Sequence, residues 1–376
     1  MTDAIAFVRD RSEPVDPPPI FGAGALAWAR TNLFSSVASS LTTLAFIALA
    51  LWVLPPLVRW ATVDAVWSAP DGALCREHQD GACWAFIGAK LDYLRFGSYP
   101  IPQRWRADAV EALGSVLIAW LLWPSAPKRA LGALLFFVAY PVAAFILLRG
   151  SPTFGLPVVD TLLWGGILVS LLTAVVGIVF SLPLGVLLAL GRRSQLPVVR
   201  LASVLFIEFV RGVPFITILF MANTMLPLFV PAAWTPDRFL RPLIGMALFS
   251  AAYMAEEVRG GLQLLGRGQY EGAMALGLNY SGMMALVILP QALTMVIPGI
   301  VNNFVGLFMD TTLVSIVGVT DFLEAMNNAF KDPVWSGPSI MATGYAFAAL
   351  FYFVFCYGMA RYGAYVERTL AKGRAQ

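Results

Sequence analysis

The sequence predicts an all-α protein that crosses a membrane about eight times. Of its 376 residues, 59% are hydrophobic and only 12% are charged, whereas an average soluble domain carries about a quarter charged residues. The apolar residues gather in runs long enough for a helix to cross the roughly 30 Å hydrocarbon core of a bilayer. Lysine and arginine cluster in the short segments between these runs, as the positive-inside rule describes. These three observations favour a polytopic membrane protein over a soluble one.

The N-terminal part of the chain contains three of the predicted spans. Residues 1–36 are polar and proline-bearing, and we interpret them as a cytoplasmic tail. The spans are expected at 37–58, 108–123 and 130–148. Residues 59–106 carry many charged residues and are expected to form a loop. The number of spans places this loop on the outer side, although it carries six arginine or lysine residues, because long loops follow the charge rule only weakly. The sequence therefore predicts an N-terminal extension, residues 37–150, ahead of a second domain.

Five further spans are predicted in a second domain, residues 158–366. They are expected at 162–190, 204–230, 240–258, 286–309 and 339–362. The span at 204–230 is interrupted by Arg211 and Pro214, because proline removes a helical hydrogen bond. The loop 310–338 and a basic tail, residues 367–376, complete the chain. An even number of spans places both termini on one side, and the basic loops put that side in the cytoplasm.

A short segment between two of the later spans is too polar to cross a bilayer. Glu271 and Ala273 lie in a stretch of small residues that predicts one or two helical turns. Gly277 is expected to end these turns, and Asn279 can cap the helix that follows. Two short helices joined by a glycine bend form a compact knob, which suits a groove in another protein.

Four motifs in this chain resemble those of one transporter family. The knob resembles the cytoplasmic EAA loop of ABC importer permeases, and we place that loop at 262–286. The other three resemble the RGxP motif, the segment before the EAA loop and the DTSLVS stretch of polar amino-acid permeases. They stand at 211–214, 252–261 and 310–315. The longer N-terminal part resembles the M-type permease of the general L-amino-acid importer. The resemblance implies a type I importer core of five helices preceded by three additional ones.

The resemblance also implies how the chain obtains energy. The knob is expected to contact a separate ATPase through Tyr270, Glu271, Ala273, Leu276, Gly277, Leu289 and Pro290. The phosphate-binding motif G-x-x-x-x-G-K-[ST] does not occur in the sequence. We therefore expect no cofactor and no enzymatic activity in this chain, with ATP and magnesium bound by the ATPase. The implied mechanism is alternating access, in which ATP binding and hydrolysis move the docked knobs.

Ionisable residues in or beside apolar spans are candidates for a substrate path. They face a bundle interior or a water-filled cavity, because burying charge in lipid is costly. The candidates are the ionisable residues Arg211, Glu208, Glu256 and Asp310, together with the polar neighbour Thr311. An arginine can hold the carboxylate of an amino acid and a glutamate its ammonium. The alternative is that Arg211 and a glutamate pair structurally or extend to the cytoplasmic interface, and the role of Glu257 stays open.

Cysteine and histidine are scarce in this chain. Three cysteines and one histidine give no reason to expect a metal site. Cys75 and Cys83 lie in the predicted outer loop, where a periplasmic environment would allow a disulfide. Two free thiols are the alternative.

We expect a multi-pass protein of the bacterial inner membrane with both termini in the cytoplasm. Its expected partners are ATPase subunits, a second related permease in a heterodimer, a periplasmic amino-acid-binding protein and the lipid bilayer, with no nucleic acid. One rival hypothesis is an ion-coupled amino-acid carrier or channel, which would need no docking knob. Another is an intramembrane enzyme, which would need a catalytic pair inside the bilayer.

Overall fold

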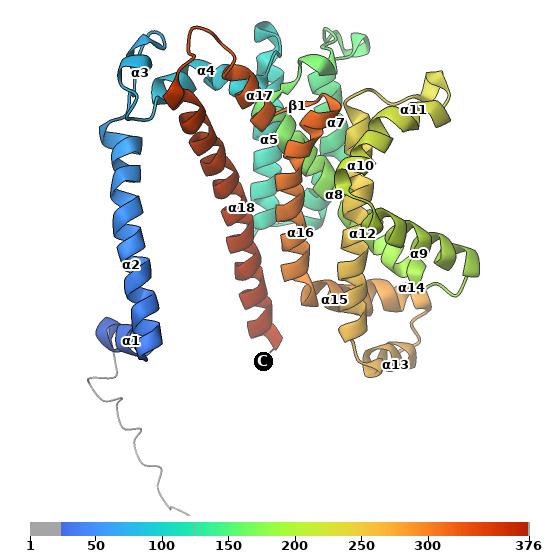
Figure 1. Ribbon diagram of the computed structural model, residues 1–376. Coiled ribbons are helices and arrows are strands. Elements are labelled where there is room, and N and C mark those ends of the chain that lie inside the picture. Colours follow the sequence, from blue (N-terminus) through green and yellow to red (C-terminus); the bar gives the residue numbers. More distant parts are fainter. Residues whose placement is uncertain (1–23, 124, 375–376) are drawn as a thin grey trace, which may run out of the picture. The chain divides into compact units, whose positions relative to one another are not determined.

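The computed structural model describes residues 24–123 and 125–374, which are mostly helical (Figure 1). The predicted all-α class is confirmed. The chain divides into two compact units, each described separately below. The smaller unit holds the chain up to residue 65 together with 80–82, and the larger unit holds 66–79 and everything from residue 83 onward. Most of the predicted N-terminal tail, residues 1–23, and the last two residues lie outside the described part.

The smaller unit is built around one long apolar helix. Its elements are α1 (Ala25–Asn32), α2 (Val37–Val58) and the π-helical turn η2 (Arg59–Val63). Helix α2 coincides with the first predicted span, because the apolar run starts directly after Ser36. The Ser36 side chain caps the helix by accepting a hydrogen bond from the Ser39 N–H. At the other end Arg59 pairs with Asp64 at 3.1 Å.

The larger unit begins with short helices where the sequence predicted a loop. Its first elements are α3 (Ala73–Glu77), α4 (Trp84–Phe96), η3 (Ile101–Gln103), α5 (Arg104–Leu122), α6 (Arg129–Leu134), η4 (Leu135–Ala139), α7 (Tyr140–Arg149), η5 (Pro152–Phe154) and η6 (Thr161–Leu163). The prediction of a loop at 59–106 was therefore wrong in its secondary structure. Helix α4 buries Phe86 and Leu94 completely, in a core that this segment shares with α17 and α18.

The remaining elements cover the predicted second domain. They are α8 (Gly166–Arg192), α9 (Pro197–Gly212), α10 (Phe215–Phe220), η7 (Met221–Met225), α11 (Leu226–Phe229), η8 (Ala232–Trp234), α12 (Leu240–Leu264), α13 (Arg267–Ala275), α14 (Tyr280–Met283), η9 (Met284–Ile288), α15 (Leu289–Met295), α16 (Ile297–Asp310), η10 (Thr311–Val317), β1 (Thr320–Asp321), α17 (Phe322–Ala329) and α18 (Pro338–Arg374). The last helix continues through most of the predicted C-terminal tail.

Within the described residues, five helices are long and apolar enough to cross a membrane. They occupy Val37–Val63, Arg129–Arg149, Gly166–Arg192, Ile297–Val317 and Pro338–Leu370. A sixth is obtained if α9 and the segment Phe215–Phe229, which meet at a 112° bend, count as one span. Helices α5 and α12 cover the other two predicted spans but carry more charge, so the predicted number of eight is approximate.

Two predicted spans are less regular than the sequence suggested. The span expected at 204–230, with a break at Arg211 and Pro214, consists of two arms at a steep angle, with Val213 and Pro214 between them. The span expected at 286–309 divides at Val296 into α15 and α16. The knob is also shorter than 262–286, because α12 continues to Leu264 and a π-helical turn begins at Met284.

Helices α8, α12 and α16 form the centre of the larger unit (Figure 1). Glycine lets these helices approach closely. A Cβ added at Gly185 of α8 would lie 2.6 Å from Met254 of α12, and one at Gly177 would lie 2.9 Å from Leu307 of α16. Helices α4 and α17 lie at one end of this unit, and α13, α14 and α15 lie at the other (Figure 1).

Candidate functional site

The knob at the end of α12 is a helix–bend–helix unit. Helix α13 ends before Gly277, which adopts φ +77°, a conformation that favours glycine. Asn279 then caps α14 by accepting a hydrogen bond from the Gly282 N–H at 2.8 Å. The bend is prominently exposed, with Leu276 at 81%. The knob therefore presents an apolar tip between two short helices.

The seven candidate coupling residues occupy different environments. Glu271, Leu276, Gly277 and Pro290 are exposed, Tyr270 and Leu289 are half-buried, and Ala273 is buried. Ala273 and its neighbours pack onto the ends of the central helices, in a cluster with Val258 and Ile288. The exposed four are available to a partner, whereas Ala273 supports the knob from beneath.

A polar contact ties the knob to α8. Arg193, just after α8, donates hydrogen bonds to the Tyr270 hydroxyl at 3.1 Å and to the Leu262 carbonyl at 3.4 Å. Its guanidinium also lies 5.7 Å from the centre of the Tyr270 ring, a cation–π distance. From the other side, Gln291 of α15 donates to the Gln269 side chain at 3.0 Å. The knob is thus held by α8 and α15.

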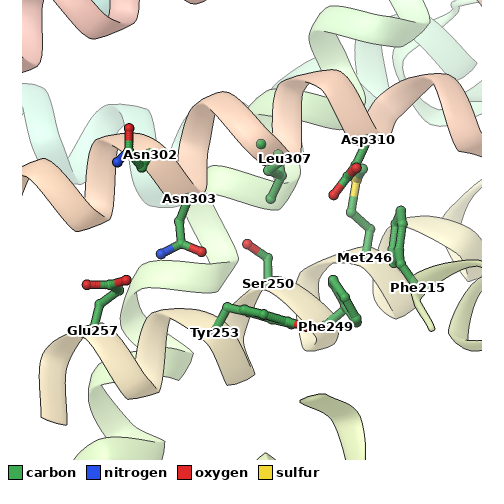
Figure 2. Close-up of a pocket in the computed structure, with 11 residues that line it drawn as sticks. Phe215, Met246, Phe249, Ser250, Tyr253, Glu257, Asn302, Asn303, Leu307 and Asp310 are labelled. Carbon is green, nitrogen blue, oxygen red and sulfur yellow. The ribbon is translucent and has the colours of Figure 1, made fainter. Parts of the chain in front are cut away.

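A cavity of about 430 Å³ lies between α10, α12 and α16. Its lining residues are Phe215, Met246, Phe249, Ser250, Tyr253, Glu257, Asn302, Asn303, Gly306, Leu307 and Asp310. Figure 2 shows Glu257 and Asp310 toward opposite ends, with Ser250 and Asn303 between them. Such a mixture of apolar walls and a few polar groups is typical of small-molecule sites.

The Glu257 carboxylate lies against the backbone of the facing helix. A Cβ added at Gly299 of α16 would lie only 2.1 Å from a Glu257 carboxylate oxygen. The carboxylate therefore occupies space that exists because residue 299 is glycine. Asn303, one turn further along α16, donates to the Gly299 carbonyl at 3.1 Å. Glu257 and Asn303 line this acidic end of the cavity.

The other predicted substrate-path residues form an ion-pair network beside the cavity. Glu256 lies 3.7 Å from Arg211 and 3.6 Å from Arg192, and it pairs closely with Arg259. Arg192 also pairs with Glu208 at 2.9 Å. The contacts of Arg211, Glu208 and Glu256 therefore agree with the alternative hypothesis, in which these residues form structural ion pairs. Arg211 still lies next to the cavity, since its guanidinium is 5.5 Å from the ring of the lining residue Tyr253.

The structure separates the remaining candidates. Asp310 lines the cavity, whereas Thr311 is buried and donates to the Phe308 carbonyl at 2.8 Å. Sequence reasoning left Glu257 open, although it lines the cavity. Successive helical residues differ by about 100° in direction, so of the neighbours Glu256 and Glu257 only one can face α16. The spacing of Ser250, Tyr253 and Glu257 places them on one face of a helix, and this pattern in the sequence could have indicated that Glu257 lines the cavity.

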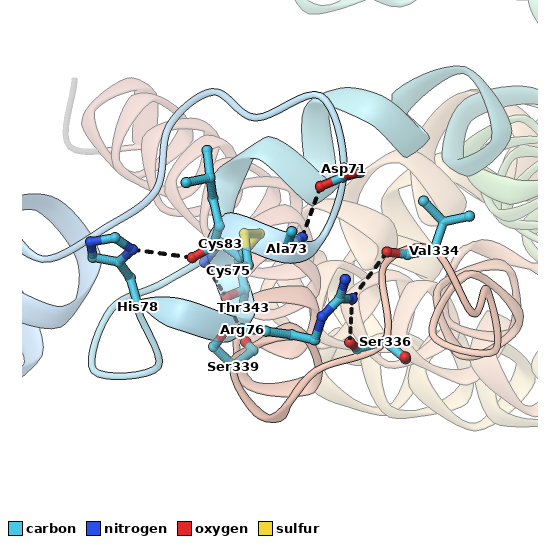
Figure 3. The surroundings of a disulfide bond; sticks show 11 residues. Asp71, Ala73, Cys75, Arg76, His78, Cys83, Val334, Ser336, Ser339 and Thr343 are labelled. Carbon is cyan, nitrogen blue, oxygen red and sulfur yellow. Dashed lines mark hydrogen bonds between the residues drawn. A yellow bond between two sulfur atoms is a disulfide. The ribbon is translucent and has the colours of Figure 1, made fainter.

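At the opposite end of the larger unit, Cys75 and Cys83 are joined by a disulfide (Figure 3). The Cys83 N–H donates to the Thr343 hydroxyl of α18 at 2.8 Å. Arg76, between the cysteines, donates to the carbonyls of Val334 and Ser336. Lys90 of α4 pairs with Asp332. The segment ahead of α5 is therefore fastened to the α17–α18 connection.

Comparison with known proteins identifies the family. Residues 181–372, half of the chain, match the family described as the inner membrane component of binding-protein-dependent transport systems. This chain belongs to that family. Because the family comprises transport permeases, the chain is a permease subunit rather than an enzyme. The resemblance drawn from the four motifs is confirmed.

The permease is similar over its whole length to two amino-acid transport proteins. It is 46% identical to the inner membrane amino-acid ABC transporter permease YhdY of Escherichia coli K12, covering 96% of this chain and 98% of that protein. It is 37% identical to the glutamate/glutamine/aspartate/asparagine permease BztC of Rhodobacter capsulatus, covering 98% of both. Both relatives include the region before residue 158. A solved amino-acid ABC transporter matches 54% of the chain with 25% identity and a TM-score of 0.47.

Proposed function

We propose that this permease is the membrane subunit of an ATP-driven importer of polar L-amino acids. The observation that carries the proposal is the cavity between α12 and α16, in a chain similar over its full length to amino-acid permeases. The cavity is large enough for a small ligand, and its polar groups suit one that carries charge at both ends. The two named relatives support the choice of amino acids as substrate class.

The cavity can recognise the ammonium of an amino acid by its acidic ends. Glu257 and Asp310 both line it, and a carboxylate is a strong acceptor for an ammonium. The substrate carboxylate can accept hydrogen bonds from Ser250 or from the amides of Asn302 and Asn303. Arg211, behind Tyr253, adds positive charge nearby. We propose Glu257 as the principal ammonium contact, because its carboxylate lies in the space that Gly299 leaves open on the cavity wall.

The knob is proposed to couple the permease to a separate ATPase. Its exposed apolar tip, Leu276, and the exposed carboxylate of Glu271 suit a groove with a basic rim. Because Arg193 and Gln291 tie the knob to α8 and α15, movement of the docked knob would be passed to the central helices. This arrangement supports alternating access driven by ATP binding and hydrolysis.

The complete importer is proposed to contain two permeases, two ATPase subunits and a binding protein. The second permease is proposed to be a related chain, giving a heterodimer. The ATPases dock on the knob side, and both permease termini lie on that cytoplasmic side. The binding protein delivers its amino acid at the opposite, periplasmic side, near α17.

The substrate site is tested by uptake into vesicles that contain the assembled importer. Glu257→Gln and Asp310→Asn remove one carboxylate each with little change in size. We expect Glu257→Gln to lower amino-acid uptake at least tenfold, while ATPase subunits still co-purify. Glu367→Gln, at an exposed position of α18, is the matched control. Normal uptake and normal substrate affinity in both cavity variants would refute the proposed site.

Coupling is tested by co-purification with the ATPase. Leu276→Asp and Glu271→Arg alter the exposed tip, and both are expected to abolish the complex without unfolding the permease. Glu367→Arg is the charge-reversal control. A complex that survives both substitutions would exclude the knob as the docking element. Uphill amino-acid uptake by the purified permease alone, driven by an ion gradient, would instead support the carrier hypothesis.

A further inference from the structure

A second cavity, of about 270 Å³, lies between α7 of the N-terminal extension and α8 and α12 of the permease core. Its walls are almost entirely aliphatic or aromatic. The lining residues are Tyr140, Pro141, Val142, Ala144, Phe145, Ile146, Leu148, Trp164, Leu172, Val175, Val176, Phe180, Phe239, Leu240 and Leu243. The cavity has no group suited to a polar amino acid, and it is separate from the proposed substrate site.

This cavity is accessible from the outside of the helix bundle. Val142 of α7 is 60% exposed and Phe180 of α8 is 45% exposed, whereas Ala144 and Leu172 are buried. Both α7 and α8 belong to candidate membrane spans. The surroundings of exposed apolar side chains at this depth are lipid hydrocarbon rather than water. A hydrocarbon chain is therefore the occupant that matches both the walls and the surroundings.

One end of the cavity carries an unused hydrogen-bond donor. Trp164 is 2% exposed, and its indole N–H has no hydrogen-bond partner among the described residues. A buried donor without an acceptor is costly, so such groups are usually satisfied by a ligand or water. Trp164 lies two residues before the span Gly166–Arg192, where tryptophan favours the lipid headgroup region.

Two arginines lie at this same end. The Arg149 guanidinium is 5.8 Å from the centre of the Phe145 ring, and Phe145 packs against Trp164 at 6.1 Å. Arg238 lines a small hollow next to the cavity, together with Trp164.

Both arginines are exposed, and neither forms an ion pair within the described part of the chain. The acidic residues nearest in sequence have local roles: Asp160 caps η6 at the Leu162 N–H, and Asp237 accepts from Thr161.

We propose that this cavity binds an anionic phospholipid of the bilayer. An acyl chain fills the apolar cavity, and the phosphate lies between Arg149 and Arg238. The Trp164 N–H donates to an ester or phosphate oxygen of the lipid. Arginine forms strong charge-assisted hydrogen bonds with phosphate, and a headgroup without an ammonium adds no positive charge that the two arginines would repel. The lipid would join the N-terminal extension to the permease core.

The test is native mass spectrometry of the purified full-length permease after exchange from vesicles. One vesicle set contains phosphatidylglycerol and the other phosphatidylcholine, each as the only phospholipid. We expect one retained phosphatidylglycerol per chain and at least fivefold less phosphatidylcholine. The double variant Arg149→Gln/Arg238→Gln should lose this preference. Trp164→Phe, which keeps an aromatic ring but removes the N–H, should reduce lipid retention severalfold. Arg200→Gln, an exposed arginine of α9, should behave like the unmodified chain.

A variant that fills the cavity gives an independent check. Ala144→Trp should abolish lipid retention, and its thermal unfolding shows whether the variant is folded. Equal retention of both lipids by the unmodified chain would overturn the anionic preference. Retention unaffected by the arginine pair and by Trp164→Phe would overturn the site, as would a purified chain that keeps no lipid.

Discussion

Asp321 allows a quantitative test of the free-energy cost of burying a carboxylate at the end of the bundle. Its side chain is fully buried at the start of α17, outside the candidate spans. The carboxylate accepts hydrogen bonds from the N–H groups of Leu323 and Glu324 at 3.0 and 3.1 Å. Burial nevertheless dominates and raises the pKa of Asp321 from 3.8 to about 6. The folded protein therefore holds the Asp321 proton more tightly than the unfolded chain does.

The sign of the pH effect follows from this difference. Between about pH 4 and pH 6 the folded state binds more protons than the unfolded state, so the free energy of unfolding falls as pH rises. Below this window Asp321 is neutral in both states and contributes no charge penalty. Above it, a pKa difference of about 2 units corresponds to a penalty of about 3 kcal/mol. Asp321→Asn keeps an acceptor for the cap and removes the charge.

We expect Asp321→Asn to be more stable than the unmodified protein above pH 6.5, by up to about 3 kcal/mol, and equally stable at pH 4. Thermal unfolding in detergent can be followed by labelling of Cys356, which is free and half-buried, at pH values where the thiol reacts. Circular dichroism extends the series to pH 4. Glu367→Gln should show no such pH dependence. A gain of the same size at both pH values, or a loss above pH 6.5, would refute the assignment of a buried charge penalty.

Three further predictions concern the substrate cavity, the knob and the disulfide. Gly299→Ala should displace the Glu257 carboxylate by about 1 Å to relieve the overlap, and substrate binding should weaken about tenfold. Gly260→Ala is the control, because its added methyl meets open space and should leave binding unchanged. Substrate binding to the reconstituted importer measures both effects. Arg193→Ala should keep the ATPase bound but lower the number of amino acids transported per ATP hydrolysed severalfold. Arg200→Ala is the control. An unchanged ratio of transport to hydrolysis would exclude the Arg193–Tyr270 contact from coupling. Cys75→Ser should lower the free energy of unfolding by about 2.5 kcal/mol, the loop-closure value for a bridge between residues eight apart. A reductant should lower the melting temperature of the unmodified chain to that of the variant. Identical melting curves would show that the bridge adds no stability.

The sequence was informative wherever local chemistry decides the structure. The long apolar run beginning at Val37 gave the bounds of α2, because the membrane requirement depends on composition and length alone. The bend at Gly277 and the cap at Asn279 were predicted because a positive φ and an N-terminal acceptor are properties of single residues. The family motifs extended this prediction to function.

The sequence was less informative where distant residues meet. Helix α4 was missed because its apolar side chains are covered by α17 and α18, which lie more than 200 residues away. A break at Pro214 was predicted, but the angle of the bend depends on how α9 packs against α8 and α12. The ion-pair network was hard to predict for the same reason, because Arg192, Glu208 and Glu256 come from three separate helices.

The bend between α9 and α10 has a mechanical consequence. Pro214 has no N–H, and the first turn of α10 begins at its carbonyl, which accepts from Thr217 and Ile218. The backbone at Val213 is extended. Rotation at these two residues would alter the angle between the arms while leaving the hydrogen bonds of both intact. The bent segment therefore consists of two helical arms joined by a two-residue hinge, and the ion pairs of Glu208 with Arg192 and of Arg211 with Glu256 attach the α9 arm to α8 and α12.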